Sequence, residues 1–266
     1  MKLRRWMTVA AAVASFLGVT CLSGAAPALA QDAAPAYVAL GDSYSSGLGA
    51  GDYGDSGDCK RSSKAYSQQW TAANSPASFD FTACSGAVTD DVLSDQLGPL
   101  NDSTGLVSIS IGGNDAGFAD TMQACVLQGE SVCLEKIEEA KSYVTGTLPG
   151  KLDSVYNAIS ERAPAAKVVV MGYPHIYKLN GECSVGISEE SRAAINSASD
   201  VLNDTIAKRA ADHGFSFGDV RDAFSGHEIC SGDSWLHSVT FPVGESYHPT
   251  EAGQTSGYLP VMEQNA

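Results

Sequence analysis

Five short apolar runs constrain the fold of this chain more than any other feature. Each run is followed within three residues by a glycine, as expected for a buried strand that ends at a turn. Helical segments separate several of the runs. Strands that alternate with helices in this way indicate a parallel sheet covered by helices on both faces. The runs are residues 37–40, 79–83, 106–111, 167–171 and 215–217, and helices are predicted at 64–73, at 135–162 with a break near 146–150, at 188–213, and at the C-terminus with Pro249 in its first turn.

Three of the segments that follow these runs carry residues suited to chemistry. Ser43 follows the first run, Gly86 the second, and the stretch 112–115 the third. In an open parallel sheet, ligands bind beyond the carboxyl ends of the strands. We therefore expect these three distant segments to meet at one edge of the sheet.

The first thirty residues are typical of an export signal. Three basic residues lie among the first five, an apolar run covers 7–22, and a small-residue cleavage site ends at Ala30. Polar residues and glycine interrupt the run, whereas a membrane anchor needs about twenty apolar residues. We expect cleavage after Ala30, a secreted extracellular protein, and a single domain over 31–266, where no repeat or change of composition occurs.

The charge of the chain argues against nucleic acid as a partner. The chain has 31 acidic residues and 16 basic ones, and three of the basic ones belong to the export signal. Proteins hold a phosphate backbone with patches of Lys and Arg. The same negative field disfavours adsorption onto anionic membranes unless an apolar patch outweighs it.

Six cysteines remain after the signal, an even number that favours three disulfides in an exported chain. Fifteen connectivities are possible for six cysteines. A zinc site is disfavoured because no two of them have the two-to-four-residue gap that such sites use. Pairing of nearest neighbours is the simplest prediction: Cys59 with Cys84, Cys125 with Cys133, and Cys183 with Cys230.

The tripeptide Gly-Asp-Ser occurs twice, and only the first copy has a promising context. Ser43 ends the copy that follows a predicted strand, so that a helix beginning there would aim its N–H groups and dipole at a developing negative charge. The second copy ends at Ser234, and no strand pattern precedes it. We interpret Ser234 as part of a loop.

Four separated blocks give the chain a specific resemblance. They are residues 41–43, 85–87, 112–115 and 246–249, which together resemble the conserved blocks of the SGNH (GDSL) hydrolases. The flanking residues most resemble the secreted actinobacterial lipases and phospholipases of that family, and the similarity runs over nearly the whole chain after the signal. The resemblance implies a three-layer α/β/α fold with a parallel, flavodoxin-like sheet.

The resemblance also implies a role for each block. It makes Ser43 the nucleophile, whose own N–H would help to bind the oxyanion, together with the N–H of Gly86 and the side-chain amide of Asn114. Glycine suits such a position because its backbone can approach a substrate closely. Asn114 could equally be a turn residue that bonds its own backbone.

The chain has five histidines, and each is a candidate for the general base. The residues alone leave the choice open between His248, whose backbone is kept extended by Pro249, and His175, which also follows a predicted strand. The resemblance favours His248.

The third member of the catalytic group departs from the family pattern. The usual aspartate three residues before the histidine is replaced by Glu245. Either Glu245 reaches the imidazole and orients it, or a backbone carbonyl, that of Ser246, takes its place and leaves a Ser–His dyad. We favour the dyad, because an added methylene at a fixed offset misplaces a carboxylate.

Together, these features predict hydrolysis of lipid carboxylic esters through an acyl-enzyme, without a cofactor. A phospholipase A1 or a broad acyl esterase is the nearest alternative. A non-catalytic carbohydrate-binding or interaction module and a metal-dependent hydrolase are alternatives of other classes. We expect a monomer whose contact with lipid surfaces is at most transient.

Overall fold

The computed structural model describes residues 34–266, which contain a five-stranded, fully parallel sheet. The strand order is β2-β1-β3-β4-β5, the flavodoxin-like order. The predicted parallel sheet is therefore confirmed, with each strand within two residues of its expected bounds. The strands are β1 (Ala36–Gly41), β2 (Ser78–Phe81), β3 (Thr104–Ser110), β4 (Lys167–Met171) and β5 (Ser216–Gly218).

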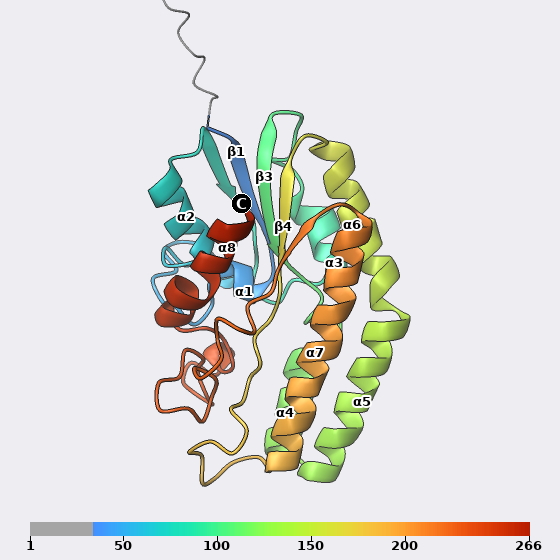
Figure 1. Cartoon of the computed structure of the whole chain (residues 1–266), viewed down its shortest axis with the longest axis vertical. Coiled ribbons are helices and arrows are strands. Elements are labelled where there is room, and N and C mark those ends of the chain that lie inside the picture. The colour runs from blue at the N-terminus through green and yellow to red at the C-terminus, as the bar shows by residue number, and fades with distance from the viewer. Residues whose placement is uncertain (1–33) are drawn as a thin grey trace, which may run out of the picture. The chain divides into compact units, whose positions relative to one another are not determined.

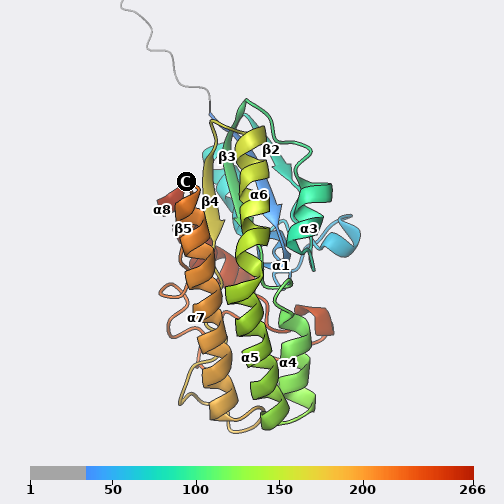
Figure 2. The same ribbon diagram turned by 90° about the vertical axis from the view of Figure 1, so that its right-hand side faces the viewer.

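Helices cover both faces of this sheet. Figure 1 shows α2 and α8 on one side and α6 and α7 on the other, and Figure 2 shows α4 and α5 continuing beside α7 beyond the carboxyl ends of the strands. The α-helices are α1 (Ser43–Ser46), α2 (Tyr66–Asn74), α3 (Thr89–Asp91), α4 (Phe118–Leu127), α5 (Glu130–Gly146), α6 (Leu148–Arg162), α7 (Glu189–Asp212) and α8 (Leu259–Asn265), with 3₁₀-helices at Gly57–Cys59 and Val243–Glu245 and π-helical turns at Val92–Gln96 and Gly253–Tyr258.

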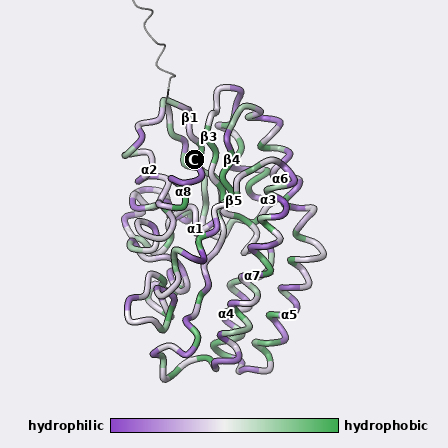
Figure 3. Tube along the Cα trace, in the orientation of Figure 1, coloured by the Kyte–Doolittle hydropathy of each residue, from purple (hydrophilic) through white to green (hydrophobic). Residues whose placement is uncertain are grey.

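The three central strands, β1, β3 and β4, lie in the middle of the hydrophobic core. All residues of β1 after Ala36 are buried, and so are nearly all of those in β3 and β4. Continuous apolar strands of this kind are typical of a sheet buried on both faces. Figure 3 shows the hydrophobic colour concentrated along these strands.

The predicted break in the long helical stretch is confirmed, and the predicted helical position of Pro249 is wrong. The break expected near 146–150 is confirmed, because α5 ends at Gly146 and α6 begins at Leu148 with a proline in its first turn. Pro249, in contrast, does not lie in the first turn of the last helical segment: it pairs with Leu236 in an isolated bridge, and Thr250 caps the turn that follows. The bridge holds Pro249 in extended backbone just ahead of the helix.

The three disulfides have the predicted pairing. Cys59–Cys84 joins the 3₁₀-helix Gly57–Cys59 to the segment after β2, and Cys125–Cys133 joins α4 to α5. The predicted export signal lies outside the described residues. Within residues 34–266, no helix has the length and apolarity needed to cross a bilayer.

Candidate active site

Ser43 sits at a sharp turn between β1 and the short helix α1 (Figure 1). Gly41, just before it, has a φ of +122°, and a Cβ there would lie 2.4 Å from the carbonyl oxygen of Ser110. Only glycine fits at this position, because the backbones of β1 and β3 lie so close together there. Asp42 caps α1 by accepting a hydrogen bond from the backbone N–H of Tyr44 at 3.0 Å. The turn thus presents Ser43 at a helix start, with 6% of its surface exposed.

His248 lies directly against Ser43, although 205 residues separate them. The Nε2 atom of His248 is 2.7 Å from the Oγ atom of Ser43. On the other side of the ring, Nδ1 is 2.9 Å from the carbonyl oxygen of Ser246. A carbonyl can only accept, so Nδ1 carries the hydrogen and Nε2 is free to accept the proton of the Ser43 hydroxyl.

The segment that carries His248 is anchored by its backbone. The Tyr44 hydroxyl donates to the carbonyl oxygen of Tyr247 at 2.7 Å, and the His237 N–H donates to the carbonyl oxygen of His248 at 3.0 Å. Tyr247 has a φ of +66°, an uncommon conformation for a residue with a side chain. This bend turns the Ser246 carbonyl back toward the imidazole.

Glu245 points to a different partner. Its carboxylate accepts a hydrogen bond from the Tyr53 hydroxyl at 2.7 Å, and that hydroxyl accepts one from the Gly49 N–H at 2.9 Å. Glu245 therefore ties the glycine-rich loop after α1 to the histidine segment, and the imidazole is held by the backbone of Ser246.

Gly86 and Asn114 lie with Ser43 and His248 along one cavity of about 680 Å³. Gly86 has a φ of +82°, while a Cβ there would meet no atom within 4 Å, so the backbone conformation is what favours glycine. The Asn114 amide donates to the carbonyl oxygen of Ala87 at 2.9 Å. That bond uses one of its two hydrogens and leaves the other for a ligand.

A buried network behind Ser43 escaped the sequence analysis. The Asp42 carboxylate accepts hydrogen bonds from the hydroxyls of Ser110, at 2.7 Å, and Tyr173, and the Tyr173 hydroxyl accepts one from the Gly113 N–H at 3.3 Å. This network connects the residue beside Ser43 with the residue beside Asn114. Tyr173 follows β4, so its position after a strand was the signal that could have revealed it.

Two other candidates lie elsewhere. His175 contacts the Asp200 carboxylate at 2.8 Å, and the Ser234 hydroxyl donates to the carbonyl oxygen of Leu236 within its own loop. Among residues 34–266, no group of three His, Cys, Asp or Glu side chains could hold a metal ion.

Comparison with known proteins identifies the family. The model of the GDSL-like lipase/acylhydrolase family matches residues 39–255. The chain belongs to this family. It is 64% identical to Lipase 1 of Streptomyces coelicolor over 256 residues, which cover 96% of this chain and 94% of that protein.

Two crystal structures resemble this family member closely. The extracellular lipase of Streptomyces rimosus is 63% identical, and phospholipase A1 of Streptomyces albidoflavus NA297 is 64% identical. Each aligns with a TM-score of 0.86 over 88% of this chain and 100% of the other. The resemblance to the GDSL hydrolases and the fold class expected from it are both confirmed.

The cavity of this GDSL hydrolase has two unlike ends. Phe118, Met122 and Val126 of α4 give it an apolar lining, together with Val239 and Val243 from the segment before His248. The other end, near Gly86, includes the charged side chains of Asp58 and Lys60. An ester that combines an apolar chain with a polar group matches this division.

Proposed function

We propose that this protein hydrolyses carboxylic esters of lipids through an acyl-enzyme on Ser43. The observation that carries the proposal is the 2.7 Å contact between the Ser43 hydroxyl and the neutral imidazole of His248, at a cavity with apolar walls. Burial lowers the pKa of His248 to about 4, so the ring is neutral and able to act as a base at pH 7.

The reaction proceeds in two balanced steps. Nε2 of His248 accepts the Ser43 proton while Oγ attacks the ester carbonyl carbon, and His248 then gives this proton to the departing alcohol. Water repeats the sequence: it gives a proton to His248, attacks the acyl-enzyme and releases the acid, while Ser43 recovers its proton. The Ser246 carbonyl stabilises the imidazolium in both steps, as a carboxylate does in a triad. No cofactor takes part.

The negative charge on the carbonyl oxygen is held by hydrogen bonds from three donors: the N–H groups of Ser43 and Gly86 and the side-chain amide of Asn114. Loss of one such donor costs about 3–4 kcal/mol of transition-state stabilisation. The bond from Asn114 to Ala87 supports this assignment, because it fixes the amide plane before substrate arrives.

Exposed apolar side chains support lipids as the substrate class. Val126 and Leu127 at the end of α4 line the cavity, as do Val239 and Val243, and Phe241 between these two is 89% exposed. Such a cluster of apolar residues is unusual on a soluble surface and suits transient contact with aggregated lipid.

We further propose that the protein is secreted and acts outside the cell. Residues 31–266 then form one catalytic domain, which acts as a monomer. Three disulfides support the extracellular part, because such bonds persist in oxidising surroundings. The solved relative from S. rimosus is described as extracellular.

Phospholipase A1 activity is the second candidate, because the S. albidoflavus relative at 64% identity carries that name. A phosphatidylcholine with different chains at its two ester positions separates the candidates. Release of the sn-1 fatty acid at a rate above that from a triacylglycerol supports the phospholipase, and the reverse supports the lipase.

Labelling with a fluorophosphonate, followed by peptide mapping, tests the nucleophile. We expect the label on Ser43, and Ser43→Ala should abolish labelling and lower kcat by at least about 10⁴-fold. Ser234→Ala is the matched control, because it alters the other Gly-Asp-Ser tripeptide, and it should keep both. A label on Ser234 in place of Ser43 would overturn the assignment.

A further inference from the structure

Three cavities meet at the ring of Phe118, the first residue of α4. The open cavity contains Ser43 and His248 and has a volume of about 680 Å³. A connecting cavity of about 30 Å³ lies against Ser43, and a back cavity of about 60 Å³ follows it. Phe118 lines all three. Leu202 and Ser199 of α7 line both the connecting cavity and the back cavity, so the two cavities lie side by side.

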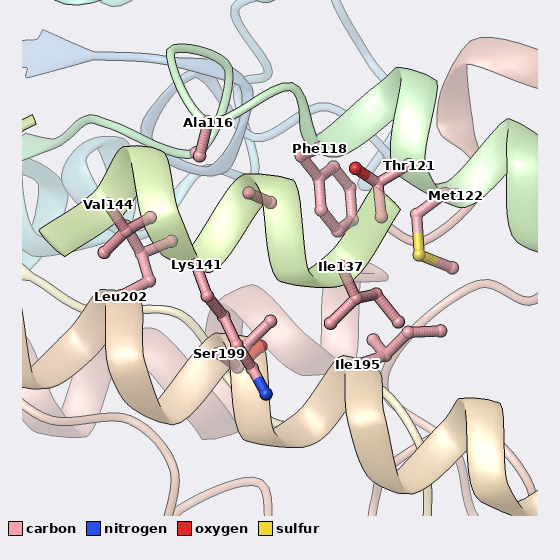
Figure 4. Close-up of a pocket in the computed structure, with 13 residues that line it drawn as sticks. Ala116, Phe118, Thr121, Met122, Ile137, Lys141, Val144, Ile195, Ser199 and Leu202 are labelled. Atoms are coloured by element: carbon pink, nitrogen blue, oxygen red, sulfur yellow. The ribbon is translucent and has the colours of Figure 1, made fainter. Parts of the chain in front are cut away.

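The back cavity lies between α4, α5 and α7 (Figure 4). Ile137 and Val144 of α5 and Ile195 of α7 give it apolar walls, and Figure 4 shows the Phe118 ring beside Ile137. The amine of Lys141, whose stem also lines the cavity, bonds to Glu138 at 3.0 Å. Apolar cavities of this kind take apolar ligands readily, because water gains few hydrogen bonds inside them.

The proton transfer from His248 to the alcohol indicates which part of the ester lies in which cavity. His248 gives its proton to the departing alcohol, so the alcohol oxygen must face the imidazole. The acyl chain then leaves the carbonyl carbon in another direction. The connecting cavity is lined by Ser43 and Asn114 but not by His248, whereas the open cavity is lined by all three.

We propose that the connecting and back cavities form the acyl-chain site, with Phe118 as the partition that turns aside when a chain enters. The alcohol portion of the lipid then occupies the open cavity. Gly117, with a φ of +72°, precedes Phe118 and gives the start of α4 the backbone freedom for this movement. This inference rests on the proposed function, because it assumes that Ser43 carries the acyl group.

Filling the back cavity tests the proposal. Ala198 on α7 lines that cavity only, so Ala198→Phe should block it without reaching Ser43. The variant and the wild type are compared on p-nitrophenyl esters from acetate to palmitate. Each excluded methylene lowers kcat/KM by about fourfold. We expect an unchanged rate on acetate and a loss of at least about tenfold on decanoate and longer esters.

Ala194→Phe is the matched control. Ala194 lies one turn earlier on the same helix and is also a partly buried alanine packed against the core, but it lines none of the three cavities. It should keep the wild-type chain-length profile, and thermal unfolding should show both variants to be folded. If Ala198→Phe keeps the wild-type profile as well, the acyl chain lies in the open cavity and the proposal is wrong.

A crystal structure of the wild type labelled with a decyl fluorophosphonate gives a second, direct measurement. We expect the decyl chain behind Phe118, between α4 and α7, and a chain lying along Val239 and Val243 would contradict the proposal. Neither outcome affects the proposed function, whose failure would show as absence of any label on Ser43.

Discussion

At the scale of residues, burial shifts the pKa values of Asp42 and His248, which both lie next to Ser43, in opposite directions. Desolvation lowers the pKa of His248 to about 4, and it raises the pKa of Asp42 to about 6 against the effect of the groups that donate hydrogen bonds to it. As pH falls from 6.5 to 4, protonation of His248 favours the unfolded chain, whereas protonation of Asp42 favours the folded one. The two contributions to the free energy of unfolding therefore oppose each other.

The pKa of His248 predicts the acid side of the pH profile. The imidazole must be neutral to accept the Ser43 proton, so activity is lost only as pH falls through the lowered pKa. We expect kcat/KM for a soluble acetate ester to stay near its plateau down to about pH 5 and to fall tenfold per unit below about 4. A midpoint near 6.5, the ordinary value for histidine, would contradict the buried, neutral ring. Asp42→Asn removes the carboxyl group beside Ser43, whose pKa is raised to about 6, and should leave the midpoint in place.

The contact between Glu245 and Tyr53 predicts a mild effect of amide substitution. Glu245→Gln keeps an oxygen that accepts from the Tyr53 hydroxyl and removes the charge. Because the Ser246 carbonyl holds Nδ1 of His248, we expect kcat/KM to change by less than about fivefold. An orienting carboxylate behaves differently, since its conversion to an amide costs about 10⁴-fold. A loss of that size would show that Glu245 is the third member of a triad.

At the scale of elements, two buried asparagines of α7 hold the segment that leaves β4. Asn203 accepts from the Tyr173 N–H at 2.8 Å and donates to the Tyr173 carbonyl at 2.7 Å. Asn196, two turns earlier, does the same for Tyr177, at 3.1 and 2.6 Å. A long helix thereby fixes the backbone beside the Asp42–Tyr173 network through side-chain amides.

Removal of one of these side-chain amides should lower the free energy of unfolding. Asn203→Ala leaves a buried N–H and a buried carbonyl without partners, at about 1–3 kcal/mol each. We expect the free energy of unfolding in urea to fall by about 2–4 kcal/mol. Asn74→Ala is the control, because Asn74 donates to a carbonyl at the exposed end of α2 and should change stability by about 0.5 kcal/mol or less. Equal losses in the two variants would disprove this role of Asn203.

At the scale of the whole molecule, negative charge opposes the apolar surface around the cavity. The formal net charge of the full sequence is −15, and the predicted export signal contains only positive charges. Anionic vesicles therefore repel the enzyme, while salt screens the repulsion within a Debye length of about 10 Å at 0.1 M.

This repulsion predicts a salt-dependent preference between lipid surfaces. At low salt we expect faster release of fatty acid from phosphatidylcholine vesicles than from phosphatidylglycerol vesicles, and the ratio should approach one as salt rises. Monomeric p-nitrophenyl acetate, which needs no surface, serves as the control and should show little salt dependence. Faster hydrolysis of the anionic vesicles at low salt would contradict the prediction.

The sequence by itself determined the features that depend on local pattern. Apolar runs stopped by glycine marked all five strands, and Gly146 and the proline after Leu148 marked the break between α5 and α6. The even cysteine count suggested the disulfides, and four short blocks pointed to the family. Short-range sterics and hydrophobic periodicity act within a few residues, so a linear pattern contains them.

Only the tertiary structure decided how distant groups face one another. It placed His248 against Ser43 and His175 against Asp200, it turned the Ser246 carbonyl toward the imidazole through the bend at Tyr247, and it joined Asp42 to Tyr173. It also brought α4, α5 and α7 together around a cavity behind Phe118. Such contacts depend on the packing of whole elements. Local sequence patterns do not show which residues that are far apart in the chain lie close together in space.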